Sequence, residues 1–205
     1  MQLLPRLAVV GLISLLSACA VTVKQTPITG PDGAPKGELR AAKKATGLNG
    51  SKVGWGRITL FAIPVAPVYI RGDDGAVVMA RVHDALRKAG YSVTVAEDGT
   101  AAEGPTLKCN VTYFRFSNYT WLVPFVPTWG EVEVDVSLHD GNDKVLWSKH
   151  FEGDGFTFNF TDGYTIAANE SLDEILEQLV VEFSSPEFVA HINATAPAEQ
   201  LVSEE

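Results

Sequence analysis

The chain has 205 residues, of which 46% are hydrophobic and 20% are charged, and its formal net charge is −9 at pH 7. Beyond residue 58, acidic side chains outnumber basic ones by 23 to eight, so the part of the chain that folds has the wrong sign of charge to bind nucleic acid. About 150 residues remain after a leader and a linker, which is enough for one domain with its own core.

The chain begins like a secretory signal. Arg6 precedes an apolar run over residues 7–16, and small residues then lead to Cys19. At about ten residues the run is too short to cross a bilayer permanently, so we expect residues 1–18 to be a signal peptide. Residues 16–19, LSAC, resemble the bacterial lipobox, which implies that Cys19 is lipidated and becomes the first residue of the mature chain.

The residue after the cysteine adds an expectation about location. In such lipoproteins an Asp at this position retains the protein at the inner membrane, whereas this chain has Ala20. The resemblance therefore implies a lipid anchor at the periplasmic face of the outer membrane. An ordinary signal peptide cut after Ala20 is the alternative, because Ala18 and Ala20 satisfy the small-x-small rule.

The second cysteine, Cys109, lies in a β-rich stretch. If the sulfur of Cys19 carries lipid, the chain cannot form an internal disulfide, and the fold must be held by its core alone. We expect Cys109 to be a small buried apolar side chain rather than a reactive thiol.

Residues 19–54 have the composition of a linker, rich in Gly, Pro, Thr and Lys and poor in large apolar side chains. Such a segment cannot bury enough surface to offset its ordering entropy, so we predict a flexible tether with a reach of about 30 to 35 Å. A short helix over residues 37–47 could form within it. Residues 20–58 carry seven basic and two acidic side chains. This excess of positive charge would attract the tether to anionic headgroups, and the alternative is a linker that is basic by chance.

The predicted domain, residues 55–192, opens with a β-rich run over residues 56–64 that Pro64 and Pro67 should stop. A helix is expected over residues 76–90, capped by Asp73 or Asp74. Strands should follow over residues 91–97 and 106–116. The helix should bury Val78, Val82, Leu86 and Ala89, and the second of these strands should place Leu107, Cys109, Val111 and Tyr113 on one face.

Residues 129–153 give the strongest structural pattern in the chain. Apolar residues alternate with acidic ones from Glu131 onwards, so one face should be buried and the other wet, and residues 140–143 should turn the chain into a hairpin. If Leu138 faces Val145, the register pairs Val136 with Trp147 and Val132 with Phe151, and it sets Glu133 beside His150.

The last helix should begin at a capping box of Ser171 and Glu174. Its apolar face consists of Leu172, Ile175, Leu176, Leu179 and Phe183. A disordered acidic tail is predicted over residues 193–205. These elements predict an α+β fold of two layers, in which a mainly antiparallel sheet has two helices packed on one face.

The sequence contains no nucleophile, phosphate-binding or paired-histidine zinc motif, and its four histidines are scattered. Glu133, Asp135, His139 and His150 share the wet face of the hairpin and could form a weak metal site, but ordinary cross-strand pairing explains them better. We therefore predict no catalytic residue, no metal ligand and no cofactor, and a protein that is not an enzyme.

An apolar loop leads into the hairpin. Pro124 and Pro127 prevent it from continuing as a central strand, and exposed apolar patches of this kind usually mark a contact surface. The surface could meet a protein partner or a membrane interface, or the loop could fold back over the end of the sheet. The candidate contact residues are Tyr119, Trp121, Leu122, Phe125, Val126 and Trp129.

Several of these features together resemble the small envelope lipoproteins typified by YajG and LptE. They are the lipobox at Cys19, the basic linker, the run GRITLFAIP, the helix ending ALRKAGYSV, the valine hairpin and the terminal helix LDEILEQLVVEF. The resemblance covers roughly residues 55–192 and implies a non-enzymatic accessory to outer-membrane machinery.

Our leading hypothesis is an anchored periplasmic binding module that engages an envelope protein through its sheet face and aromatic loop. One alternative is a lipid or lipopolysaccharide handler that contacts acyl chains through residues 119–129. The other is an envelope enzyme that uses the region of Glu133 and His150.

Overall fold

The computed structural model describes residues 20–23, 36–48, 52–58, 63–70, 73–96, 104–120, 127–159 and 162–194. Within these residues eight strands form one sheet, which three helices accompany. In chain order the elements are β1 (Ala20–Val21), β2 (Gly37–Ala42), β3 (Lys52–Ile58), β4 (Ile63–Ile70), α2 (Asp74–Lys88), β5 (Tyr91–Ala96), β6 (Thr106–Thr120), β7 (Thr128–His139), β8 (Val145–Thr157), α3 (Gly163–Phe183) and α4 (Pro186–Asn193).

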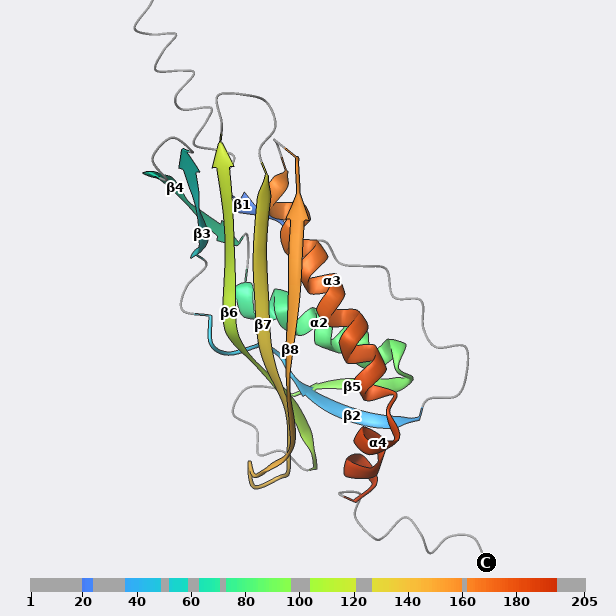
Figure 1. Ribbon diagram of the computed structural model, residues 1–205. Coiled ribbons are helices and arrows are strands. Elements are labelled where there is room, and N and C mark those ends of the chain that lie inside the picture. The colour runs from blue at the N-terminus through green and yellow to red at the C-terminus, as the bar shows by residue number, and fades with distance from the viewer. Residues whose placement is uncertain are drawn as a thin grey trace, which may run out of the picture.

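Strand β6 organises the sheet because, at 15 residues, it is long enough to pair with three other strands. One of its edges pairs antiparallel with β7, which continues into β8. The other edge is divided: β3 pairs in parallel with residues 116–120, and β2 pairs in parallel with Thr106 and Leu107. Beyond these, β4 and β1 extend the sheet on the side of β3, and β5 extends it on the side of β2 (Figure 1).

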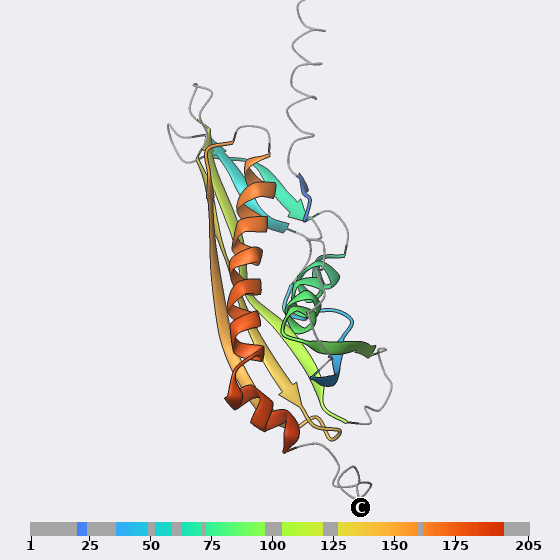
Figure 2. The ribbon, with the colours of Figure 1, turned by 90° about the vertical axis from the view of Figure 1, so that its right-hand side faces the viewer.

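The helices lie on one side of the long strands. Figure 2 shows α3 running along β7 and β8, and α2 packs between α3 and β5. The structure is compatible with the predicted α+β class. The sheet is mixed and curled rather than mainly antiparallel, however, and the described residues form three helices instead of two. Much of this difference comes from β1 and β2, which pair in parallel and which sequence analysis assigned to a tether.

Three pieces of the predicted tether belong to the sheet. Strands β1 and β2 lie inside residues 19–54, and β3 begins there at Lys52. Strand β2 has partners on both sides, and its Leu39 and Ala41 are buried. The prediction of a flexible tether, and of a helix over residues 37–47, is therefore wrong for these residues. The prediction relied on composition, but neighbouring strands supply hydrogen bonds to the backbone of a segment. A segment with few apolar side chains can therefore still belong to a sheet. Residues 24–35 of the tether lie outside the described residues.

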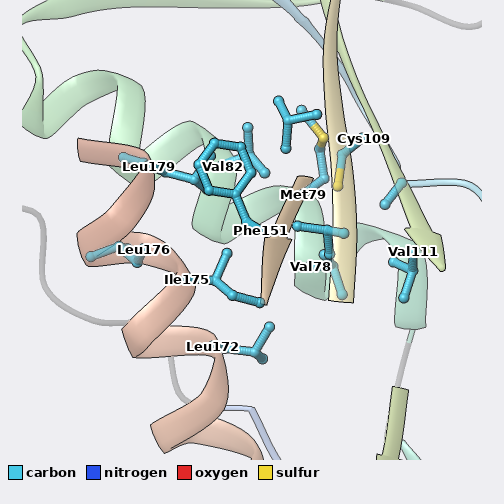
Figure 3. Packing of buried hydrophobic residues seen from close by; sticks show 14 of the residues in the cluster. Val78, Met79, Val82, Cys109, Val111, Phe151, Leu172, Ile175, Leu176 and Leu179 are labelled. Carbon is cyan, nitrogen blue, oxygen red and sulfur yellow. The ribbon is translucent and has the colours of Figure 1, made fainter. Parts of the chain in front are cut away.

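Both predicted helical stripes are confirmed. The named residues of α2 and α3 are buried, and Figure 3 shows Leu172, Ile175 and Leu179 of α3 on the side facing Phe151. In the same view Val78 and Met79 of α2 lie near Cys109 and Val111 of β6. Cys109 is only 2% exposed, and its burial raises the pKa of the thiol to about 12. Cys109 is thus a buried apolar side chain, as expected.

The helix starts are partly as predicted. Asp73 caps α2, because its Oδ1 accepts a hydrogen bond of 3.2 Å from the amide of Ala76. The capping box at Ser171 and Glu174 is wrong, since α3 already begins at Gly163. Inside the helix the Ser171 hydroxyl donates to the carbonyl of Ala167, and Glu174 reaches across to β8. A serine inside a helix can donate its hydroxyl to a carbonyl of the preceding turn. In sequence, such a serine cannot be told from one that caps the start of a helix.

The prolines at 64 and 67 lie inside β4 instead of ending a strand. The predicted run over residues 56–64 is divided between β3, which ends at Ile58, and β4, which begins at Ile63. The described partner of β4 on its outer edge is β1, and it reaches only Tyr69 and Ile70. A proline is tolerated where a strand edge has no ladder hydrogen bond to lose.

Two irregularities change which residues face each other in the long strands. A bulge between Val111 and Tyr113 turns Tyr113 away from the helices, in contrast to its predicted place beside Cys109. A second register shift follows Leu138, which pairs with Trp147 and not with Val145. As a result Val134 pairs with Phe151, Val136 with Lys149, and Asp135 with His150.

Candidate functional site

The candidate site lies on the face of β6, β7 and β8 that is turned away from α3, which we call the outer face. Along β7 the valines are buried against the helices, and the acidic residues that alternate with them point the other way. No described helix covers this face (Figure 2). The described helices therefore leave the side chains of the outer face uncovered.

Five carboxylates form a band across the outer face, which we call the acidic band: Glu131, Glu133 and Asp135 of β7, and Glu152 and Asp154 of β8. Glu131 pairs with Asp154, and Glu133 pairs with Glu152, so like charges lie directly opposite each other. Desolvation raises the pKa of Glu131, and the charges of Glu133, Asp154 and Glu152 raise it further. The band is thus a region of concentrated negative charge.

His150 is paired within the acidic band. Its Nδ1 lies 2.7 Å from Oδ1 of Asp135, and its Nε2 lies 3.7 Å from Oε2 of Glu133. The hydrogen bond to Asp135 raises the pKa of His150 above its ordinary value, and the nearby carboxylates add to this although desolvation opposes it. The predicted contact with Glu133 exists, but the shifted register makes Asp135 the closer partner.

The four residues considered as a metal site do not converge. His139 lies at the turn, where its ring contacts the Ser137 hydroxyl at 2.8 Å and the Asp143 carboxylate at 2.9 Å. His150 instead pairs with Asp135. In the part of the chain that the structure describes, no group of three or more His, Cys, Asp or Glu side chains is placed to hold a metal ion.

A groove crosses one end of the outer face, where the acidic band meets aromatic side chains. Its volume is about 460 Å³, and the side chains that matter for its chemistry are Tyr113, Arg115, Trp129, Glu131, Asp154 and Phe156. Register sets five of these residues and Ser117 in two adjacent rows, Arg115 with Glu131 and Asp154, then Ser117 with Trp129 and Phe156. Tyr113 lies in the next row, opposite Glu133. The groove therefore presents aromatic rings, two carboxylates and the Arg115 guanidinium to the same ligand.

The aromatic side chains continue past the groove to the end of β8. Trp129, Phe156 and Phe158, which we call the aromatic end, are 40%, 53% and 61% exposed. The rings of Phe156 and Phe158 pack edge to face with their centroids 4.9 Å apart. Three large aromatic residues are thus exposed at one place, and patches of this kind usually belong to contact surfaces.

The structure tests only part of the predicted contact loop. Trp129 is exposed on the outer face and lines the groove, and the backbone of Tyr119 belongs to β6. Trp121, Leu122, Phe125 and Val126 lie outside the described residues, as does Cys19. Whether the loop closes the end of the sheet or meets a partner stays a prediction.

Sequence analysis missed Tyr113, Arg115, Asp154, Phe156 and Phe158. The bulge in β6 hid the first two, because simple alternation assigns them to the wrong faces. The predicted hairpin ends at residue 153, whereas β8 continues to Thr157. Continuing the alternation of the hairpin from Glu152 to Phe156 could have found the others.

The free edge of β8 is closed by side chains of α3. The Glu174 carboxylate accepts from the amide of Asp154 at 2.9 Å, and the Glu170 carboxylate accepts from the amide of Phe156 at 3.1 Å. Gln178 donates to the carbonyl of Glu152 at 2.7 Å. These three residues recur every fourth position, so they line one side of the helix and satisfy the groups that another strand would use. These contacts obstruct the addition of another strand along this part of β8.

No helix in the described part of the chain is both long enough and apolar enough to cross a membrane.

No family model and no curated protein matches the sequence. Among solved structures, a neuraminyllactose-binding hemagglutinin homolog from Helicobacter pylori has a TM-score of 0.50 at 9% identity, over 85% of this chain and 98% of that one. A DUF330 protein from Xanthomonas campestris has a TM-score of 0.48 at 16% identity, over 78% and 91%. Lipoprotein GNA1162 from Neisseria meningitidis has a TM-score of 0.31 at 16% identity, over 77% and 99%. The chain is therefore similar in fold to the Helicobacter pylori protein, and at 9% identity this similarity concerns the fold alone.

Proposed function

We propose that the chain is a lipid-anchored envelope lipoprotein whose domain is a non-enzymatic binding module for an envelope protein. The lipobox at Cys19 and the following Ala20 support an anchor at the periplasmic face of the outer membrane. A closer relation to the YajG and LptE type rests on sequence pattern. The observation that carries the binding function is the groove on the outer face, where exposed aromatic rings and the acidic band meet.

The groove favours a basic segment of a protein. Glu131 and Asp154 can pair with a Lys or Arg side chain, and Trp129 or Phe156 can lie against its alkyl stem or its cation. Aromatic anchors beside charge pairs are typical of the residues that dominate protein interfaces. The like charges within the acidic band add a reason for a cationic partner to bind, because it would relieve their mutual repulsion.

The same charges argue against the alternative of lipid or lipopolysaccharide handling at this groove. Phosphate-bearing headgroups would meet the carboxylates of the acidic band and be repelled. Acyl-chain contacts through residues 119–129 would depend largely on residues 121–126, which lie outside the described residues. We therefore favour the protein partner.

The proposal is tested with a photoreactive phenylalanine analogue in place of Tyr113 in the full-length protein in cells. Irradiation is expected to join the groove to a basic segment of a protein, identified by sequencing the crosslinked peptide. The same analogue at Val181, which is 73% exposed on α3, should not give this adduct.

Charge reversal decides whether the contact is specific. Replacing both groove carboxylates, Glu131→Lys with Asp154→Lys, should remove the adduct. Glu177→Lys with Glu187→Lys makes the same change of net charge at exposed positions of α3 and α4 and should leave the adduct in place. A protein adduct that survives the double reversal, or an adduct made of lipid alone, would contradict the proposal.

A further inference from the structure

The residues that follow Cys19 directly are part of the folded domain. Strand β1 pairs in parallel with the end of β4, Ala20 with Tyr69 and Val21 with Ile70. The side chain of Val21 is completely buried and belongs to the main hydrophobic core. A segment that is paired in the sheet and inserted into the core is fixed relative to the domain.

Helix α3 holds the next residue. The amide of Thr22 donates to Oγ1 of Thr165 at 3.2 Å, and Nδ2 of Asn169 donates to the carbonyl of Thr22 at 3.1 Å. Asn169 is itself positioned by the buried Arg81 of α2, whose Nη2 donates to its Oδ1 at 3.2 Å. The start of the mature chain is thus bound to β4 and to α3, with α2 supporting the contact.

These contacts leave almost no free chain between an anchor and the domain. Cys19 is bonded to Ala20, so their Cα atoms are about 3.8 Å apart. A free coil of 35 residues would have given a reach of about 30 to 35 Å. A lipid on Cys19 would therefore hold the domain against the bilayer instead of letting it move at a distance.

The position of β1 decides which end of the molecule faces the bilayer. Figures 1 and 2 show β1 at the end of the molecule where β6 and β8 end and where β7 and α3 begin. Trp129 and Phe158 lie at this end because they are near the start of β7 and just past the end of β8. The β7–β8 turn and α4 lie at the opposite end (Figure 1).

We infer that the domain is mounted on the bilayer in one orientation by its docked N-terminal strand, with Phe158 of the aromatic end against the lipid surface and with Trp129 and Phe156 left to the groove. The inference rests on the lipidation at Cys19 in the proposed function. Aromatic side chains are the residues that favour the interface between lipid and water, and here they are exposed at the end where the anchor must lie. The acidic band then stands beyond the membrane contact, accessible to a protein partner.

The test uses the full-length protein, processed in a bacterial host, purified in detergent and reconstituted into phosphatidylcholine vesicles whose acyl chains carry a fluorescence quencher. A small thiol-reactive fluorophore is placed at Phe158→Cys, or at Asn142→Cys in the β7–β8 turn as the control. Cys109 does not compete for the label, because it is buried and its thiol pKa is raised to about 12. The intact mass of each sample shows whether Cys19 carries lipid.

In lipidated protein we expect loss of most of the fluorescence at position 158 and none at position 142. Insertion of a long Gly/Ser linker between Cys19 and Ala20 should restore the signal at position 158. Equal quenching at the two positions, no quenching at either, or quenching that persists fully with the linker would each overturn the inference.

Failure of the inference is distinguishable from failure of the proposed function. An intact mass without lipid removes the anchor, and an absent groove adduct removes the binding role. A lipidated protein that captures its partner but shows no quenching at position 158 would contradict the mounting alone.

Discussion

At the scale of single residues, Gly153 and Gly155 determine how closely α3 lies on β8. A Cβ atom added at Gly155 would lie 1.9 Å from the carbonyl oxygen of Ala167, and one added at Gly153 would lie 2.2 Å from that of Ser171. Backbone oxygens cannot move away without shifting the helix. The close approach of α3, and with it the closure of the β8 edge, therefore depends on these two glycines.

We expect Gly155→Ala to lower the free energy of unfolding by about 2 to 3 kcal/mol, the usual cost of inserting atoms into a filled contact. Urea denaturation followed by fluorescence measures the change. Ser148→Ala, an exposed position of the same strand, is the control and should stay within about 0.5 kcal/mol of the parent protein. Equal stability of the two variants would show that α3 can yield at this point.

His150 and Asp135 give a pH-dependent prediction. The folded state raises the pKa of His150 above the unfolded value, so the pairing stabilises the protein at low pH, and this stabilisation is lost as pH rises through the folded pKa. Asp135→Asn should lower the pKa of His150, measured by NMR titration. The variant should be less stable than the parent protein at pH values below the unfolded pKa of His150, and this deficit should disappear as pH rises through the folded pKa. A titration curve of His150 that does not move would contradict the prediction.

His83 is shifted in the opposite direction, and it would be a useful internal reference in the same titration. Burial lowers its pKa, and its ring lies 3.0 Å from the carbonyl of Ala42 in β2. Its neutral form is the one the folded state favours, so His83 reduces stability as pH falls below the unfolded value. Asp135→Asn should leave the titration of His83 unchanged, because His83 is buried on α2 whereas Asp135 lies on the outer face of the sheet.

At the scale of elements, the side chains of α3 replace a missing strand at the edge of β8. Glu170, Glu174 and Gln178 satisfy three backbone groups, and Glu182, one turn further on, pairs with Lys149 of the same strand. An open edge invites pairing with another chain. The spacing of four residues along α3 thus both orders the helix on the sheet and keeps the edge from associating.

Glu174→Ala should expose the amide of Asp154 to exchange. Loss of one hydrogen bond of about 1 kcal/mol corresponds to roughly a fivefold faster hydrogen exchange at that amide if exchange follows local opening. Mass-spectrometric exchange over residues 152–157 measures this change. Glu177→Ala removes the same charge one turn away and should leave the exchange of β8 as it is.

Removing all three edge contacts, in Glu170→Ala, Glu174→Ala, Gln178→Ala, should promote association through β8. Sedimentation velocity is expected to show concentration-dependent dimers or larger species that the parent protein does not form to the same extent. A triple variant that sediments like the parent protein would mean that the edge is protected in another way, for example by the inward-facing charges of the strand.

At the scale of the whole molecule, the N-terminal strand joins the anchor to the core. Val21 is fully buried although it lies only two residues after the proposed lipidation site. Val21→Ala should lower the free energy of unfolding by about 2 kcal/mol, from two lost methylene equivalents and the cavity that they leave. Val145→Ala, at a position 51% exposed, is the matched control and should change little. If both variants unfold alike in urea, β1 is not part of the cooperative unit.

The periodic parts of the chain were predictable from sequence. The valines of β7 and the apolar stripes of α2 and α3 follow the 2.0 and 3.6 residue periods, and the structure buries them as expected. Bulges and helix starts were less predictable. One inserted residue in β6 moves Tyr113 to the other face of the sheet, and one hydrogen bond of its hydroxyl lets Ser171 lie inside α3 instead of capping it. Such details depend on packing and not on periodicity.

The candidate site was predictable only in part. Glu131 was predicted on the wet face of the hairpin, and Trp129 was a candidate contact residue of a loop whose exposure was left open. Their neighbours Arg115 and Asp154 come from strands whose registers the sequence did not fix. The groove exists because three strands bring distant residues into the same two rows. A single-strand pattern says which face a residue occupies and not which residues share its row.

The sequence by itself determined the amphipathic helices and the two-faced hairpin, because each depends on residues close together in the chain. The secretory leader and the lipobox stay predictions from the same kind of local pattern. Only the tertiary structure decided that β1 and β2 belong to the sheet, that α3 closes the edge of β8, and that aromatic and acidic side chains meet in one groove. The physical reason is the same in each case. Backbone pairing and burial are supplied by partners far away in sequence, so a segment with few apolar residues can be held as firmly as one with many.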